Sequence, residues 1–293
     1  MALPAAPVGW RDRLIGRAVP LPVRRNAFVA VGGLVVVLFV MAAAFPRLFT
    51  PASPTALYVG PPLSPPSVQH WFGTDELGRD FFARVVYGAR DSLVMSVLVV
   101  AIGALAGTAI GALAGFRGGA VDEVLMRVVD LFLSLPAFIL ALALSAFLGR
   151  GMTSVVIALS IVWWPSYARQ VRGMVLSTKH RLHVQSARAL GASRWRIVRR
   201  HILPFTYGQL NTRVTQDLGF ALVNVAGLSF LGVGAQPPAS EWGLLLNAGR
   251  TYVTNGWWLT VFPGLAITVW TLGAALLGDG LAARLRGENE GRR

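Results

Sequence analysis

The sequence contains no cysteine, and its charged residues are few and mostly basic. Without a thiol the chain has no disulfide, no cysteine nucleophile and no cysteine-ligated metal. Charged residues are 14% of the 293 positions, against about 25% in soluble domains. Lys and Arg outnumber Asp and Glu by 27 to 13, but the arginines flank segments too apolar to remain in water, which argues against a nucleic-acid partner. We predict an integral membrane protein in contact with lipid.

Charge is also missing from six apolar segments, each close to the roughly 20 residues that a spanning helix needs. None of the six contains Asp, Glu, Lys or Arg. We therefore expect an all-α membrane protein with six transmembrane helices. The first should be retained rather than cleaved, because Pro46 and Arg47 follow it instead of a small-residue cleavage site. The predicted spans are Asn26–Phe45, Ser92–Phe116, Leu131–Gly149, Gly151–Ala168, Leu218–Val233 and Trp257–Gly278.

The basic residues predict the orientation, since cytoplasmic segments of membrane proteins are enriched in Lys and Arg. With both termini in the cytoplasm, 21 of the 27 basic residues lie on the cytoplasmic side. The expected organisation is a cytoplasmic segment at 1–25, a first helix and outer loop at 26–91, a core at 92–283 with a cytoplasmic loop at 176–205, and a cytoplasmic tail at 284–293.

The cytoplasmic loop Val184–Pro204 contains residues that typically start, cap and end helices, which predicts an ordered segment. Gly191 tolerates left-handed geometry and predicts a bend after a first short helix. Ser193 is suited to cap a second helix, and Pro204 is expected to end it. Two short helices bent at a glycine indicate a surface that holds a partner. A cationic loop resting on anionic lipid is the alternative, but it would not require Gly191, Ser193 and Pro204 at these positions.

Two outer segments are more than simple turns. Residues 46–70 contain seven prolines, which favours a stiff, extended crossing of the surface. Thr74 is expected to cap a short amphipathic helix within Gly73–Leu93. The Trp242–Ala248 piece is interpreted as an interfacial helix with Trp242 at headgroup depth. Surface packing and docking of a partner are both open for these segments.

Four motifs, in order along Gly73–Gly243, resemble one known family. They are GTDELGRD, YGAR-SL, RALGAS…RHILP and LSFLGVGAQPP…EWG. Together they resemble the second, C-type permease of dipeptide and oligopeptide ABC importers. The cytoplasmic loop is similar to the EAA loop of ABC importer permeases: it matches at Ala187, Gly191 and Leu203-Pro204, and departs at Gln185 and Ser186, where Glu and Ala are usual.

The resemblance implies a type I ABC importer permease core of five helices preceded by one extra N-terminal helix, in the bacterial cytoplasmic (inner) membrane. Such a chain pairs with a second permease to form the path for di- and oligopeptides. An extracytoplasmic solute-binding protein delivers the substrate, and two ATPase subunits, which bind ATP and Mg, contact the loop 182–204. This chain would then be no enzyme and carry no cofactor. Nickel importers share the permease pattern, so a metal complex or another small solute is an alternative substrate.

Three groups of residues are candidates for these roles, and none is expected to bind a metal, since the four histidines show no clustering with carboxylates. Polar or aromatic residues in the spans could line the path, although they could equally pack helices together. The ATPase-coupling set is Gln185, Ser186, Ala187, Arg188, Gly191, Ser193 and Pro204. The candidate path residues are Trp163, Trp164, Asn224 and Ser229, and the candidate platform for a binding protein is Trp242, Asn247 and Arg250.

A self-contained secondary transporter is a different class to weigh. Such proteins usually carry ionisable residues inside the membrane, and the six predicted spans have none. Arg213 and Asp217 are four residues apart at the cytoplasmic start of the fifth span, and we expect them to form a structural helix pair. The sequence has no phosphate-binding P-loop, so the energy for transport is expected from another chain. A passive scaffold would remain only if no transport depended on the chain.

Overall fold

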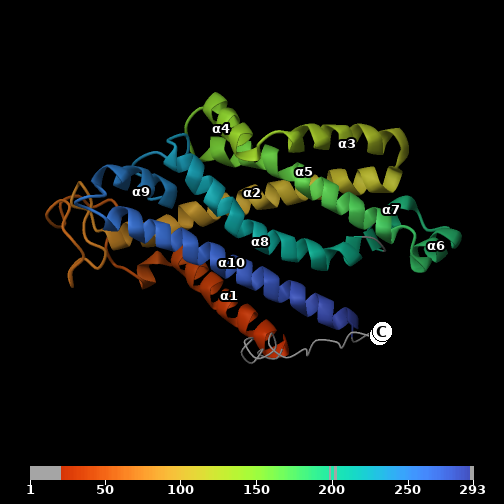
Figure 1. Ribbon diagram of the computed structural model, residues 1–293, viewed down its shortest axis with the longest axis horizontal. Helices are drawn as coiled ribbons and strands as arrows, with labels where there is room; N and C mark the ends of the chain where they lie inside the picture. The colour runs from red at the N-terminus through yellow and green to blue at the C-terminus, as the bar shows by residue number, and fades with distance from the viewer. Residues whose placement is uncertain (1–20, 198, 201–202, 291–293) are drawn as a thin grey trace, which may run out of the picture.

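The computed structural model describes residues 21–197, 199–200 and 203–290, and regular structure in these ranges is helical (Figure 1). The one strand-type pairing there is an isolated bridge between Thr74 and Asp80. The predicted all-α class is confirmed. In chain order the elements are α1 (Leu21–Ala44), η1 (Pro46–Leu48), α2 (Phe81–Arg117), α3 (Gly119–Ser134), α4 (Ala137–Leu148), α5 (Met152–Thr178), α6 (Leu182–Ala189), α7 (Arg194–Ile197), α8 (Leu203–Phe230), α9 (Trp242–Gly249), η3 (Arg250–Tyr252) and α10 (Trp258–Glu290).

Helix α2 runs along α5 for much of its length, and the contact is made by glycine (Figure 1). The glycines of α2 that face α5 recur every four residues: Gly103, Gly107, Gly111 and Gly115. A Cβ atom added at Gly107 would lie 2.5 Å from the carbonyl oxygen of Trp164, well inside normal contact distance. Small residues let membrane helices approach closely. The two backbones are therefore packed with almost no side chain between them.

The extra first helix, α1, lies along α10, on the side of the bundle away from α3 (Figure 1). Glycines again set the distance. A Cβ at Gly32 would lie 2.5 Å from the backbone nitrogen of Leu277, and one at Gly280 would lie 2.5 Å from a methyl carbon of Val29. The N-terminal helix is therefore an integral part of the packed bundle.

The predicted span Leu131–Gly149 is not one straight helix. The chain breaks between α3 and α4, and the two helices are bent by 90°. Leu135 has extended backbone angles because the ring of Pro136 disfavours the α conformation in the residue before it. Helix α3 also begins earlier than expected, at Gly119.

Within the described residues, three helices are each long and apolar enough to cross a membrane, and the bent pair α3–α4 would be a fourth. The three are α1, α2 and α10. The predicted spans Gly151–Ala168 and Leu218–Val233 fall largely on α5 and α8, which have 27 and 28 residues. At 1.5 Å per residue each is about 40 Å long, enough to cross a hydrocarbon core of about 30 Å.

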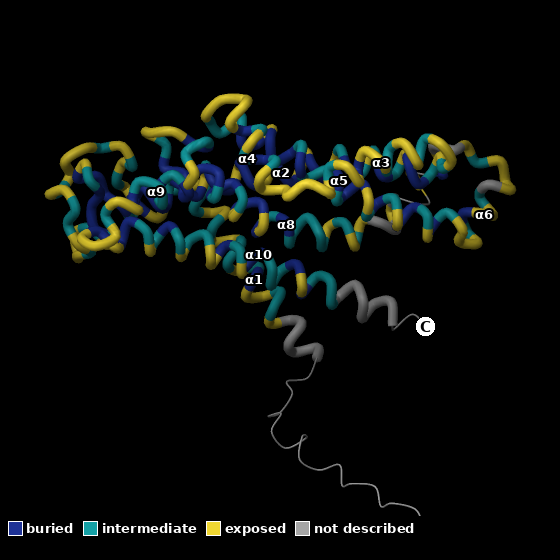
Figure 2. The backbone as a smooth tube through the Cα atoms, turned by 45° about the horizontal axis from the view of Figure 1, so that its top comes forward, coloured by how far each residue is buried: buried dark blue, intermediate teal, exposed yellow. Residues whose placement is uncertain are grey.

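Large apolar side chains are exposed along the long helices, as expected of surfaces that contact lipid. Val37, Leu105 and Leu131 have exposed fractions of 57%, 73% and 64%. Figure 2 shows buried residues where the central helices pack and exposed ones over their outer faces. Soluble monomers rarely expose contiguous apolar patches of this kind.

The proline-rich segment and the residues that follow it, 50–80, are folded onto the end of the bundle where α2 begins (Figure 1). A carboxylate oxygen of Asp75 accepts hydrogen bonds at 2.6 Å from both Arg79 Nε and Arg84 Nη1, and all three side chains are buried. Trp258 of α10 donates through Nε1 to the carbonyl oxygen of Thr74 at 3.0 Å. The proline-rich segment is therefore joined to a fixed cap of the bundle.

The expectation that Thr74 caps a helix is wrong. Thr74 Oγ1 donates instead to the carbonyl oxygen of Pro61, at 2.6 Å. The helix begins at Phe81, and its cap is Asp80, whose carboxylate accepts from the backbone nitrogen of Ala83 at 2.8 Å. Asp is as good a cap as Thr, so sequence alone did not select between the two positions.

The glycine contact between α2 and α5 generates a stability prediction. In Gly107→Ala the new Cβ meets Tyr167 and the Trp164 carbonyl, so the helices must move apart. Overpacking of this kind costs about 1–3 kcal/mol. Gly33→Ala on α1 is the matched control, because a Cβ there has nothing within 4 Å. Thermal unfolding in detergent should show a lower Tm for Gly107→Ala only; equal Tm values would contradict the close contact.

Candidate functional site

The loop between α5 and α8 forms two short helices, α6 and α7, at the opposite end of the molecule from α9 (Figure 1). Two buried residues anchor it: Val184 of α6 and Ile197 of α7 pack against Val171 and Val175 of α5. The other face of α6 is exposed. The loop is thus held on one side by α5 and open to a partner on the other.

The bend between α6 and α7 is built as the sequence predicts. Gly191 has φ of +79°, a left-handed conformation that L residues rarely adopt. The backbone nitrogen of Ala192 donates to the carbonyl oxygen of Ala187 at 3.0 Å, which closes a Schellman motif at the end of α6. Ser193 then caps α7, with its Oγ accepting from the backbone nitrogen of Arg196 at 3.3 Å.

Pro204 does not end the second helix. Helix α7 is Arg194–Ile197, residues 199–200 are π-helical, and Pro204 lies in the first turn of α8, where the missing N–H of proline costs no hydrogen bond. Residues 198 and 201–202, which the prediction had placed in this helix, lie outside the described residues, as does the side chain of Arg188. Of the predicted second helix, the described residues are α7 and the π-helical residues 199–200.

The exposed face of α6 carries both polar and apolar groups. Gln185 is exposed, and its Nε2 donates to the carbonyl oxygen of His180 at 3.1 Å. Ser186 is exposed and Ala187 is half-buried. Leu182 and Leu190, at the two ends of the helix, are 82% and 88% exposed. Neither leucine is among the residues predicted for coupling, although two leucines in a polar loop are a signal for an apolar contact.

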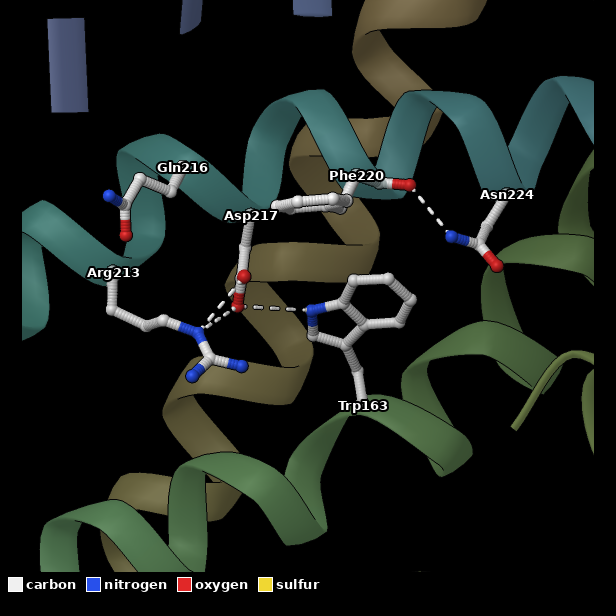
Figure 3. Close-up of a pocket in the computed structure, with 6 residues that line it drawn as sticks. All are labelled: Trp163, Arg213, Gln216, Asp217, Phe220 and Asn224. Atoms are coloured by element: carbon white, nitrogen blue, oxygen red, sulfur yellow. Dashed lines mark hydrogen bonds and ion pairs between the residues drawn. The ribbon is translucent and has the colours of Figure 1, made fainter. Parts of the chain in front are cut away.

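A second candidate site is a cavity of about 440 Å³ between α5 and α8 (Figure 3). Its polar centre is an ion pair: Arg213 Nε donates to the two carboxylate oxygens of Asp217 at 3.0 and 2.9 Å. Trp163 Nε1 lies 3.4 Å from the same carboxylate. The predicted Arg213–Asp217 helix pair is confirmed. The lining residues are Trp163, Arg213, Gln216, Asp217, Phe220 and Asn224.

The candidate path residues separate into two groups. Trp163 and Asn224 both line the cavity. Trp164 points elsewhere and packs edge-on against Phe132 of α3, with ring centroids 5.6 Å apart. Ser229 is buried, and its Oγ accepts from the backbone nitrogen of Ala235 in the turn after α8. The structure therefore does not bring Trp164 and Ser229 to this cavity.

At the end of the bundle where α2 begins, Trp242–Ala248 is helical as predicted, but the interfacial placement of Trp242 is wrong. Trp242 is 1% exposed, and its Nε1 donates to the carbonyl oxygen of Val85 at 2.8 Å. Asn247 donates to the carbonyl oxygen of Phe230. Of the three platform residues, only Arg250 is classed as exposed. Trp242 is therefore a core residue that joins α9 to α2.

The start of α9 depends on a buried carboxylate, Glu241. Its oxygens accept from the backbone nitrogens of Gly243 and Leu244 at 3.0 and 2.9 Å, and from Ser92 Oγ of α2 at 3.3 Å. Burial raises the pKa of the Glu241 carboxyl above its usual range, while the backbone hydrogen bonds act in the opposite direction. Glu241 thus combines a helix cap with a link between α9 and α2.

Comparison with known proteins identifies the family. The profile described as "Binding-protein-dependent transport system inner membrane component" matches residues 107–287, which include both the loop and the cavity. The chain belongs to this family. The permease is 36% identical over 271 residues, 92% of its length and 91% of the relative's, to the probable D,D-dipeptide transport system permease protein DdpC of Escherichia coli (strain K12).

A second relative is the glutathione transport system permease protein GsiD of Escherichia coli O6:K15:H31, with 43% identity over 259 residues, 88% of the permease and 86% of the relative. A solved structure of the MetNI methionine ABC transporter in an inward-facing conformation has a similar fold. Its TM-score is 0.54 at 20% identity, covering 67% of the permease and 93% of that chain. The ABC importer permease class predicted from the motifs is confirmed.

The burial of Trp242 predicts a large effect on stability. Trp242→Ala removes a filled core position and the hydrogen bond to Val85, and such truncations cost about 3–5 kcal/mol. Trp71→Ala is a matched control, because Trp71 is 63% exposed. The Tm of the purified permease should fall much further for Trp242→Ala. Similar, small decreases in Tm for both variants would contradict the burial of Trp242.

Proposed function

We propose that the chain is the permease subunit of an ATP-driven importer of di- and oligopeptides, forming the path together with a second permease. The observation that carries the proposal is similarity over about nine-tenths of the chain to two permeases whose names specify a dipeptide and glutathione. Both solutes are short peptides. An extracytoplasmic binding protein would deliver the substrate, and the family description, which refers to binding-protein-dependent transport, supports that partner.

The loop 182–204 is the proposed contact with an ATPase subunit. ATP and Mg would be bound and ATP hydrolysed in two partner subunits, with no catalytic residue in this chain. Exposed Leu182 and Leu190 would supply apolar contacts to the ATPase, and Gln185 and Ser186 between them would supply hydrogen bonds. Because Val184 and Ile197 pack on α5, a displacement of α6 would be passed to that helix.

The proposed topology has six membrane crossings, with both termini in the cytoplasm. Helices α1, α2, α5, α8 and α10 would cross singly, and the bent pair α3–α4 would make the remaining crossing. The distribution of basic residues supports this orientation. It places α6 and α7 inside and the cap formed by residues 50–80 and α9 outside, where Asn247 and Arg250 would lie near the binding protein. The proposed membrane is the bacterial cytoplasmic membrane.

A nickel complex or another small solute is the less favoured alternative substrate. The two relatives have names that specify a dipeptide and glutathione, and neither name specifies a metal. A self-contained secondary transporter has no support from the relatives, which are permeases of transport systems.

The bend at Gly191 provides the test of coupling. Gly191→Val places a β-branched residue in a left-handed conformation at a cost of about 1–3 kcal/mol, although its side chain would meet nothing within 4 Å. In the assembled transporter, substrate-stimulated ATP hydrolysis and peptide uptake should fall together. Gly191→Asn is the control, because Asn tolerates this geometry, and it should retain most activity. Normal uptake by well-expressed Gly191→Val would overturn the coupling role.

The cysteine-free sequence allows a direct test of orientation. Val68, 93% exposed in the outer loop, and Ala189, exposed at the end of α6, are suitable single positions. Val68→Cys should react with a membrane-impermeant thiol reagent in spheroplasts, and Ala189→Cys only after the membrane is permeabilised. The reverse pattern would invert the topology.

A further inference from the structure

We propose that the cavity between α5 and α8 is a binding site for the carboxylate end of a short peptide, held by the guanidinium of Arg213. This inference rests on the proposed function as a peptide permease. It adds a specific site and a specific chemical group to it. The site belongs to this chain, so its preference for a carboxylate would be independent of the substrate preference of the binding protein.

The geometry of Arg213 carries the inference. Asp217 accepts hydrogen bonds only from Nε, and in Figure 3 no dashed line joins either terminal nitrogen of Arg213 to that carboxylate. Among the described residues no hydrogen bond joins Nη1 or Nη2 to a partner. The guanidinium carbon also lies 5.7 Å from the ring centroid of Tyr167, which restricts its position further.

A guanidinium held in this way, with two terminal nitrogens available to donate, is suited to bind a carboxylate. Arginine binds carboxylates through two parallel N–H···O bonds, and these charge-assisted bonds are among the strongest in proteins. Because Asp217 and Tyr167 already fix the guanidinium, less side-chain freedom is lost when a ligand binds. Arg213 and Asp217 together have no net charge, so the cavity suits a solute whose own ammonium and carboxylate charges cancel.

The remaining lining groups fit the rest of a short peptide. Trp163 and Phe220 offer aromatic surfaces on two sides of the cavity (Figure 3). The side-chain amide nitrogen of Asn224 donates to the carbonyl oxygen of Phe220 at 2.8 Å. The amide oxygen of Asn224 can therefore accept a hydrogen bond from a peptide N–H. A volume of about 440 Å³ is within the range of small-molecule sites.

The experiment measures binding to the complete transporter in nanodiscs, without the binding protein. The probes are radiolabelled alanyl-alanine and, as competitor, its C-terminal amide. The unaltered complex should bind the acid at millimolar concentration and the amide at least roughly tenfold more weakly, since one charge-assisted pair is lost. Arg213→Gln should lower the affinity for the acid by a similar factor and abolish the preference. Arg213→Lys should retain part of it.

Arg127→Gln is the matched control, because Arg127 is an exposed arginine on α3 that pairs with Glu123 at 3.0 Å. It should bind both probes like the unaltered complex. Thermal unfolding of each complex identifies a variant that has not assembled. If Arg213→Gln does not assemble, the comparison of acid and amide binding by the unaltered complex is by itself the test of the carboxylate site. No measurable binding, equal binding of acid and amide, or an undiminished preference in assembled Arg213→Gln would each overturn the site.

A separate assay distinguishes failure of the site from failure of the proposed function. Proteoliposomes containing the complete transporter are supplied with its binding protein, ATP and a mixture of labelled short peptides. Uptake of peptide by the unaltered complex, together with equal binding of acid and amide, overturns the carboxylate site and leaves the peptide permease standing. Absence of uptake for every peptide overturns the proposed function, and the inference with it.

Discussion

The structure depends on the close contact between α2 and α5, which four glycines make possible. Any side chain at Gly107 would meet the backbone of α5, so the two helices are held at a fixed distance and register. Both candidate sites are attached to this pair. Trp163 on the α2-facing helix α5 forms a wall of the cavity, and Val171 and Val175 further along it support the loop. The contact thus fixes the spacing between cavity and loop.

Helix α5 joins the two sites mechanically. From Trp163 to Val175 is twelve residues, or about 18 Å of helix. Pro165 lies within this stretch and removes one intrahelical hydrogen bond, so the helix can flex near the cavity. The far end is tied to α3: Arg172 donates through Nε and Nη2 to the two carboxylate oxygens of Asp122 at 2.5 and 2.7 Å. A movement imposed on α6 would therefore reach the cavity through a single helix, with Pro165 as a point of flexure, and would take α3 with it, as the proposed coupling requires.

The features that sequence predicted correctly are local, and those it missed depend on packing. Gly191 and Ser193 form their bend and cap because left-handed geometry and a hydroxyl cap are properties of a few neighbouring residues. Proline was harder to interpret: Pro136 breaks a helix, whereas Pro204 lies in the first turn of one, and only the position of the preceding backbone separates the two cases. Trp242 was misplaced because a tryptophan in an apolar segment of a membrane protein fits the interface and the core equally well, and the Val85 carbonyl that decides it is 157 positions away.

The two ends of the bundle resist deformation to different degrees. At the end of the bundle capped by residues 50–80 and α9, Asp75, Arg84 and Glu241 are buried and each has a hydrogen-bond partner, although Arg84 Nε has none. Removing one partner of the buried Asp75–Arg84 pair would leave a buried charge unpaired, at a cost of about 3–5 kcal/mol. Towards the loop end the ion pair between Arg169 and Asp130 has side chains more than half exposed, and such pairs contribute about 0–1 kcal/mol. The Arg172–Asp122 pair is less exposed and is the stronger tie between α5 and α3. The small cluster around Val184 and Ile197 is the main attachment of α6 and α7. Displacement of α6 and α7 therefore breaks fewer buried interactions than displacement of the cap, so a force applied at the loop would move the helix ends near the loop more than the capped ends.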